Sequence, residues 1–288
     1  MINNEATKTR IRKFFGSSPQ HVYRMSDLGK ILSENRANWQ GIAYWTQSKF
    51  INFLLENTDL RKVTLRSEQY GDESRYVWRQ ASEYEIALSL RRNSYLTHAT
   101  AIFLHGLNNQ IPATVYVNHE QSAKPRRGTL TQEGINRAFK SPQRQSNYIF
   151  EYGKKRILVV NGKNTGRLGV IPLTASTKET LEVTNIERTL IDSSVRPAYA
   201  GGIFQVVEAF KRARGGVSAD QLVTTLKQLD YVYPYHQVIG FYMEKAGYDE
   251  SSLAQMERLG TAFDFYATYG LKRTEYNKRW RLFHPRGM

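Results

Sequence analysis

The first 80 residues contain the pattern that most constrains the fold, because three helical periodicities are followed there by two alternating segments. Apolar residues recur at the i, i+3, i+4 spacing that places them on one side of a helix. These residues are Ile11, Phe14 and Phe15; Leu28, Ile31 and Leu32; and Phe50, Ile51, Phe53, Leu54 and Leu55. Ser26 and Thr46 are suited to cap the second and third helices. Strands are expected over 62–66 and 75–79, with Gly71-Asp72 as the turn.

Three helices and a hairpin in this order are the layout of a winged helix-turn-helix, in which the third helix enters a DNA groove and the hairpin is the wing. The polar side of the third helix offers groups that bind base edges and phosphates, namely Gln47, Ser48, Lys49 and Asn52. The wing carries cations suited to backbone phosphates, namely Arg61, Lys62, Arg66, Arg75 and Arg79. The alternative is a winged helix that binds protein and touches no DNA.

The net charge of +15, from 41 Lys and Arg against 26 Asp and Glu, favours a polyanionic partner. The excess is spread along the chain, and a basic loop over 121–129 adds Arg126 and Arg127 as candidate DNA contacts. The absence of Cys excludes a disulfide scaffold and thiolate chemistry. Because no apolar run reaches the ~18 residues of a membrane span and no signal peptide is evident, we expect a cytoplasmic protein with no membrane partner.

The chain as a whole is predicted to be α+β. A winged helix-turn-helix over residues 1–80 is followed by a mixed α+β domain over 81–288, whose last ~50 residues are expected to be a helical extension. In that second domain, Glu187 is predicted to close a capping box that begins at Thr184. Arg188 and Asp192 are spaced to form a structural i, i+4 pair.

Catalytic motifs are not evident, and we expect no catalytic residue, no metal and no cofactor. The segment 162–169 looks like a phosphate loop, but it lacks the terminal G-K-[ST] and lies between expected strands, so a hairpin turn is the preferred interpretation.

The six His are scattered and are interpreted as structural. A metal-dependent nuclease built on Glu151, Lys154 and Asp192 would lack a second, correctly spaced Asp. The aromatic run 231–236 is expected to be exposed and to contact protein.

Two blocks of sequence carry a resemblance to a known family. Residues 95–107 (YLTHATAIFLHGL), and residues 184–192 (TNIERTLID) followed by 196–202 (RPAYAGG), resemble the AbiEi antitoxins of bacterial type IV abortive-infection toxin–antitoxin systems. The similarity covers roughly residues 1–230 and includes the winged-helix pattern.

The resemblance implies a non-enzymatic regulator. Its winged helix would bind operator DNA and repress its own operon, and its C-terminal antitoxin domain would support repression and neutralise an AbiEii-like nucleotidyltransferase toxin. Two alternatives remain: a defence-system subunit that acts by protein contact with an idle winged helix, and the nuclease.

Overall fold

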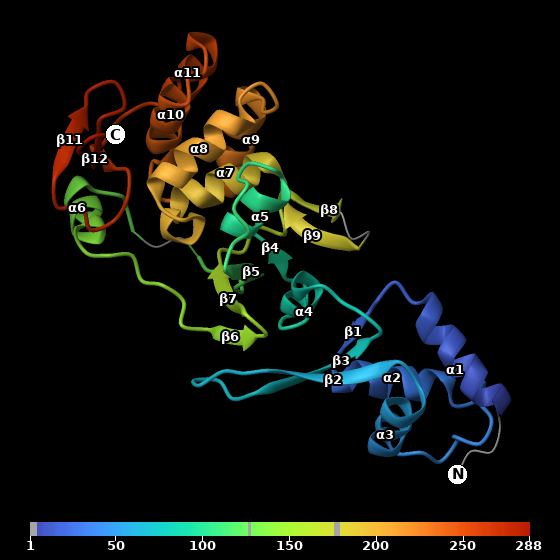
Figure 1. Cartoon of the computed structure of the whole chain (residues 1–288). Helices are drawn as coiled ribbons and strands as arrows, with labels where there is room; N and C mark the ends of the chain where they lie inside the picture. The colour runs from blue at the N-terminus through green and yellow to red at the C-terminus, as the bar shows by residue number, and fades with distance from the viewer. Residues whose placement is uncertain (1–4, 126–127, 176–178) are drawn as a thin grey trace. The chain divides into compact units, whose positions relative to one another are not determined.

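The structure is a computed structural model that describes residues 5–125, 128–175 and 179–288. The chain is mixed α+β with several sheets (Figure 1). It divides into two compact units. The N-terminal unit comprises Met1–Ser94 and Tyr148–Ile157, and the C-terminal unit comprises Tyr95–Asn147 and Leu158–Met288.

The N-terminal unit contains four helices and four strands among its described residues. They are α1 (Glu5–Ser17), β1 (Val22–Tyr23), α2 (Met25–Asn35), α3 (Gln47–Asn57), β2 (Leu60–Leu65), β3 (Glu73–Trp78), α4 (Glu83–Leu88) and β6 (Ile149–Tyr152). Three of the strands form an antiparallel sheet in the order β1-β3-β2. The core lies between this sheet and α1–α3, where Phe15 stacks on Trp78 with ring centroids 5.0 Å apart.

Local capping explains where the helices of this unit begin. The Thr46 hydroxyl accepts a hydrogen bond from the Lys49 N–H at 3.2 Å, so the predicted cap of α3 is confirmed. The predicted Ser26 cap is wrong. Helix α2 already begins at Met25, and the Asp27 carboxylate accepts from the Arg24 N–H at 2.8 Å.

The N-terminal unit extends beyond residue 80, where the sequence placed the domain boundary. Helix α4 belongs to it because the Ser89 carbonyl just after that helix accepts hydrogen bonds from the guanidinium groups of Arg24 and Arg75. Strand β6 returns to this unit from much later in the chain, and it is bridged to Arg66 through Glu151. Contacts between residues so far apart in sequence leave no local signal.

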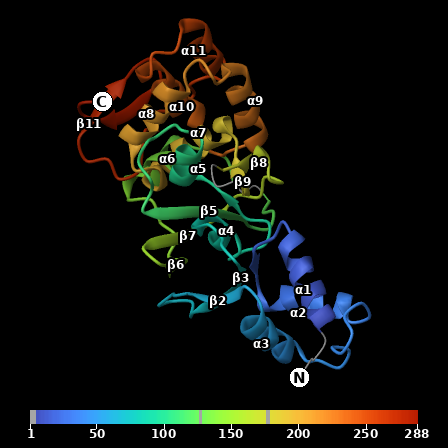
Figure 2. The same cartoon turned by 45° about the vertical axis from the view of Figure 1, so that its right-hand side comes forward.

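The C-terminal unit is built on strands β4 (Tyr95–Leu96), β5 (Thr114–Glu120), β7 (Lys155–Gly162), β8 (Val170–Thr174) and β9 (Thr180–Thr184). Their order is β7-β5-β4-β9-β8, with β4 antiparallel to β5 and parallel to β9. Helices α7 to α11 group together beside β8 and β9 (Figure 2). The helices of this unit are α5 (His98–Leu104), α6 (Gln132–Lys140), α7 (Ile186–Val195), α8 (Ile203–Ala213), α9 (Ala219–Leu229), α10 (Tyr235–Lys245) and α11 (Glu250–Glu257).

Two sequence-based expectations for this unit are wrong. The segment 162–169 is not a hairpin turn, because β5, β4 and β9 lie between the strands that it joins. The C-terminal extension is helical only in α10 and α11. It ends in a small sheet of β10 (Phe265–Tyr266), β12 (Leu282–Pro285) and β11 (Thr274–Asn277), in that order. The aromatic rings of Tyr266, Tyr276 and Phe283 pack together across this sheet, which is a non-local arrangement.

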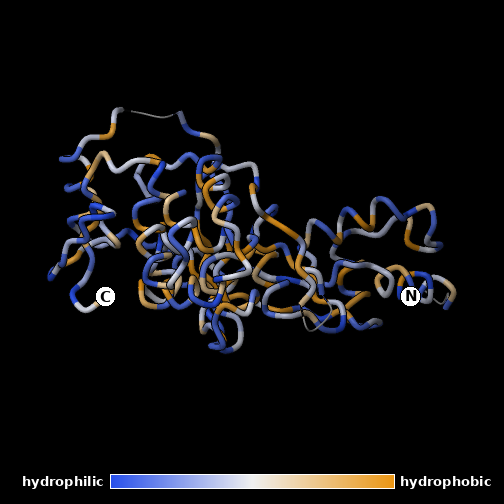
Figure 3. Tube along the Cα trace, turned by 90° about the horizontal axis from the view of Figure 1, so that it is seen from above, coloured by the Kyte–Doolittle hydropathy of each residue, from blue (hydrophilic) through white to orange (hydrophobic). Residues whose placement is uncertain are grey.

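The hydropathy trace agrees with the two cores, because apolar stretches recur inside each unit among hydrophilic ones (Figure 3). Of the helices in residues 5–125, 128–175 and 179–288, none combines the length and apolar character that a membrane span requires.

The C-terminal sheet is fixed to α10 by the fully buried Trp280. Its indole N–H donates to Glu244 at 2.9 Å, and its ring occupies the space beside Gly240. A Cβ at position 240 would lie 2.2 Å from Trp280 Cζ3, so only glycine allows this approach. The neighbouring Arg279 binds Glu250 and Glu257, each at 2.6 Å.

We expect Gly240→Ala to lower the free energy of unfolding by about 1–3 kcal/mol, because the new methyl group displaces the Trp280 ring. This loss should outweigh the gain of about 1 kcal/mol that alanine normally brings to a helix. Gly216→Ala is the control in the same unit, since its Cβ would meet only the Ala213 carbonyl oxygen at 3.6 Å. Urea denaturation measures both variants, and equal stabilities would contradict the proposed packing.

Candidate functional site

The exposed side of α3 is the first candidate site. Phe50 and Leu54 are fully buried against the N-terminal core, whereas Ser48, Lys49 and Asn52 face solvent. The Lys49 ammonium lies 5.2 Å from the centre of the Trp45 ring, which positions this cation over the start of the helix. A helix with one apolar side and a free polar side can offer hydrogen-bond donors to a groove.

Gln47 has a structural role in the helix pair. Its side-chain amide donates to the Met25 carbonyl, and a Cβ added to Gly29 would lie 2.9 Å from Gln47 Cδ. The side chain therefore fills the contact between α2 and α3. This position does not favour the predicted contact of Gln47 with bases, because the side chain is half-buried and its amide is already hydrogen-bonded.

The basic residues predicted for the hairpin have different environments. Arg61, Lys62 and Arg66 are exposed on and just after β2. Arg79 is exposed but forms an ion pair with Asp59 at 3.1 Å. The predicted phosphate contact at Arg75 is wrong: this side chain is 4 % exposed and binds Glu73 at 2.6 Å and the Ser89 carbonyl at 3.1 Å.

The distal end of the hairpin is held within its own unit. Arg66 and Glu151 exchange two backbone hydrogen bonds, of 3.0 and 2.8 Å, so β6 covers part of the β2 edge. The rings of Tyr70 and Tyr148 also meet edge to face at 4.4 Å. Arg61 and Lys62 therefore lie in the first part of β2, which follows α3, whereas Arg66 lies at the turn end of this strand with its backbone bonded to β6.

Tyr44 was missed by sequence reasoning. It is 98 % exposed in the loop that leads into α3, next to the buried Trp45. A fully exposed aromatic ring at the start of this helix adds an apolar, stackable group to the surface. The sequence does not show this exposure, because tertiary packing decides that Trp39 and Trp45 are buried and Tyr44 is not. The predicted contacts Arg126 and Arg127 lie outside the described residues.

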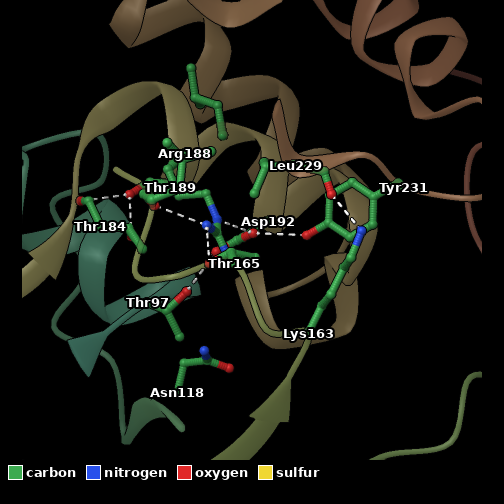
Figure 4. Close-up of polar contacts among 12 residues, drawn as sticks. Thr97, Asn118, Lys163, Thr165, Thr184, Arg188, Thr189, Asp192, Leu229 and Tyr231 are labelled. Carbon is green, nitrogen blue, oxygen red and sulfur yellow. Dashed lines mark hydrogen bonds and ion pairs between the residues drawn. The ribbon is translucent and has the colours of Figure 1, made fainter. Parts of the chain in front are cut away.

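A buried ion pair organises the C-terminal unit. The Arg188 Nε donates to Asp192 Oδ1 at 2.7 Å, and both side chains are at least nine-tenths buried, so the predicted i, i+4 pair is confirmed. Thr97 Oγ1 and the Tyr231 hydroxyl donate to the same carboxylate at 3.3 and 3.2 Å (Figure 4). Arg188 also donates to the Leu168 carbonyl at 2.9 Å. One pair thus joins the start of α5, the loop 163–169 and the segment after α9.

A second carboxylate extends this network. Glu120 accepts hydrogen bonds from the Thr165 hydroxyl, the Thr165 N–H and the Tyr95 hydroxyl. Burial opposes ionisation of Glu120, but these bonds outweigh it and lower its pKa. Burial raises the pKa of Tyr95, which keeps that hydroxyl a donor. Burial lowers the pKa of Arg188, but Asp192 outweighs this effect, and the net shift is upward.

The cap of α7 differs from the predicted capping box. The Asn185 side chain accepts from the Arg188 N–H at 2.9 Å, so Asn185 is the cap and Glu187 does not close a box with Thr184. The Thr184 hydroxyl instead bonds the Thr189 hydroxyl at 2.7 Å. Asn185 lies one position after Thr184, and the i, i+3 rule cannot separate the two registers.

His98 opens α5 with a left-handed φ of 50° and is 4 % exposed. Its ring meets the Tyr199 ring edge to face at 5.3 Å. Burial lowers the pKa of His98 to about 4, so the ring is neutral near pH 7. His105 bonds the Thr184 carbonyl at 2.6 Å. The contacts of both residues are those of histidines with a structural role.

The predicted exposed aromatic cluster 231–236 is mostly covered. Tyr235 is 5 % exposed, Tyr231 and Tyr233 are half-buried, and only Val232 is largely open at 54 %. The tyrosine rings pack on one another and on Phe265, which covers Tyr235 and leaves Tyr231 and Tyr233 partly exposed. Within the described residues, no group of three or more His, Cys, Asp or Glu is placed to hold a metal ion.

Comparisons with known proteins give one informative result. No protein-family model and no curated protein match the chain. The crystal structure of the RV2827C protein from Mycobacterium tuberculosis is similar in fold, with a TM-score of 0.58. The match covers 97 % of this chain and 91 % of that chain at 14 % sequence identity. At this identity the similarity extends to the fold alone.

We expect Asp192→Ala to lower the free energy of unfolding by about 3–5 kcal/mol, because it leaves the Arg188 charge buried and unpaired. Removing both charges in Arg188→Met/Asp192→Ala should cost less than the sum of the two single changes. Glu208→Ala is the control: its pair with Lys211 is exposed and should contribute less than about 1 kcal/mol. Urea denaturation gives all four values, and additive single changes would rule out the coupling.

Proposed function

We propose that this protein is a DNA-binding transcriptional regulator whose N-terminal unit is a winged helix-turn-helix. The element order supports this proposal: α1, the short β1, α2 and α3 precede the β2–β3 hairpin. The observation that carries it is the free polar side of α3, with Ser48, Lys49 and Asn52 exposed beside the cations of β2. A helix of this kind fits the major groove, where Lys and Asn can bind base edges.

Unpaired positive charge gives this surface its affinity for a polyanion. Among the described residues, no carboxylate forms an ion pair with Lys49, Arg61, Lys62 or Arg66. Each cation that meets a phosphate releases condensed counterions, so binding should weaken steeply with salt. The net charge of +15 adds long-range attraction for DNA.

We expect Lys49→Ala/Asn52→Ala to weaken binding to the DNA upstream of the gene by at least about tenfold, because each base contact is worth about 1–3 kcal/mol. Lys62→Ala/Arg66→Ala should instead lower the slope of log K against log salt by about 2, since each phosphate contact contributes about 1. Fluorescence anisotropy on labelled duplexes measures both effects.

Lys272→Ala, at an exposed position in the C-terminal unit, is the control and should bind this DNA as the unaltered protein does. Equal affinity for upstream and random duplexes would overturn the repressor proposal.

We further propose that the chain is an AbiEi-like antitoxin that counters a nucleotidyltransferase-like toxin. The two sequence blocks on which the resemblance rests are in contact. Leu96 pairs with Val183 just ahead of the second block, Thr97 donates to Asp192, and His105 bonds the Thr184 carbonyl. Residues far apart in sequence thus form one continuous region of the C-terminal unit. This supports the interpretation of the two blocks as a single family feature.

Co-expression tests the antitoxin proposal. Induction of a nucleotidyltransferase-like gene adjacent to this one should arrest growth, and simultaneous expression of the full chain should restore it. The Lys49→Ala/Asn52→Ala variant should still restore growth when both genes are expressed from foreign promoters, because repression is then irrelevant. Failure of the unaltered chain to restore growth would count against the antitoxin role and leave DNA binding unaffected.

A further inference from the structure

A hollow of ≈ 480 Å³ lies in the C-terminal unit, at a place that the DNA-binding proposal does not use. Its lining comes from the segments 121–125, 161–164 and 230–235, together with Arg196. Two sequence features with no assigned role meet there: the loop that looks like a phosphate loop and the aromatic run after α9. The fold brings them together across more than 60 residues, as the bond from Lys163 to the Leu229 carbonyl shows.

Three cations line this hollow against one carboxylate among its described residues. The Lys163 ammonium donates to the carbonyls of Leu229 and Asp230, at 2.7 and 2.5 Å, and lies 5.7 Å from the centre of the Tyr231 ring (Figure 4). The Lys124 ammonium donates to Gln121 at 2.8 Å, which leaves further donors free. Arg196 forms no ion pair with any described residue, and Asp230 is the carboxylate. The net charge of the lining favours an anion.

Tyrosine rings give another part of the hollow an aromatic lining. Tyr231, Tyr233 and Tyr235 line the hollow, and the rings of Tyr231 and Tyr235 meet edge to face at 5.4 Å. The Tyr231 hydroxyl is fixed by its bond to Asp192, so its ring cannot swing away without breaking the buried network. Planar rings held in this way offer a surface on which a flat heterocycle can stack. Asn161 adds an amide able to donate and accept.

We infer that this hollow binds a nucleoside phosphate. The base would stack against the tyrosine wall, and the phosphate would meet Lys124, Lys163 and Arg196. The volume lies within the roughly 300–1,000 Å³ that ligand pockets in proteins occupy. The site belongs to the C-terminal unit alone, so it is independent of the DNA surface on α3 and β2.

Isothermal titration calorimetry on the full chain tests this inference. AMP and ADP should bind, whereas adenosine and inorganic phosphate, which lack one half of the recognition each, should bind at least about tenfold more weakly. Lys124→Gln/Arg196→Gln should lower the affinity for ADP at least about tenfold, because two phosphate-binding charges are lost. Both substitutions avoid the buried network and should leave the circular dichroism spectrum unchanged.

Lys272→Gln/Arg273→Gln is the matched control: it removes the same charge from exposed positions of the same unit outside the hollow. Its affinity for ADP should stay within about twofold of the unaltered protein. An equal loss in both double variants would mean non-specific attraction and overturn the site. So would the absence of nucleotide binding at about 1 mM, a ligand excess that would detect even weak sites. Binding of oligo(A) without binding of AMP would assign the hollow to single-stranded nucleic acid instead and would also overturn it.

The regulator proposal and the nucleotide-site proposal can fail separately. The Lys49→Ala/Asn52→Ala variant should bind ADP like the unaltered protein, because its changes lie in the N-terminal unit. If the unaltered protein binds ADP but binds upstream and random duplexes equally, the regulator proposal alone is contradicted.

Discussion

The buried pair of Arg188 and Asp192 is the interaction on which the C-terminal unit depends. Two charges out of water are tolerated only when each is paired and its remaining hydrogen bonds are made. The hydroxyls of Thr97 and Tyr231 donate hydrogen bonds to the Asp192 carboxylate, and the Arg188 guanidinium donates to the Leu168 carbonyl. A polar cluster of this kind tolerates few alternative arrangements, so it specifies how α5, the loop 163–169 and the segment after α9 meet.

That constraint reaches the surface at the hollow beside Tyr231. The same hydroxyl that completes Asp192 fixes a ring of the hollow, and Lys163 lies over that ring while it bonds two carbonyls. Binding sites are more selective when their walls are rigid before the ligand arrives, because less conformational freedom is lost on binding. A structural ion pair and a candidate ligand site are therefore parts of one network in this unit.

The N-terminal unit separates its stabilising residues from its free ones along the same elements. On β2 and β3, Arg75 is buried and bonded while Lys62 is exposed. On α3, Gln47 fills the contact with Gly29 while Asn52 is open to solvent. The sequence shows five basic residues in the hairpin without distinguishing them. Only the packing of α4 and β6 reveals which of them are available to a partner.

Features that depend on residues three or four positions apart could be predicted from the sequence. The Thr46 cap and the pairing of Arg188 with Asp192 both follow from local helix geometry. The role of the loop 163–169, the burial of Tyr235 and the burial of Arg75 could not be predicted, because each depends on contacts with segments far along the chain. By itself, the sequence determined the first three helices, the two strands of the hairpin and the excess of positive charge. Strand order and side-chain exposure were decided by tertiary packing alone, since burial is a property of neighbours that local spacing does not specify.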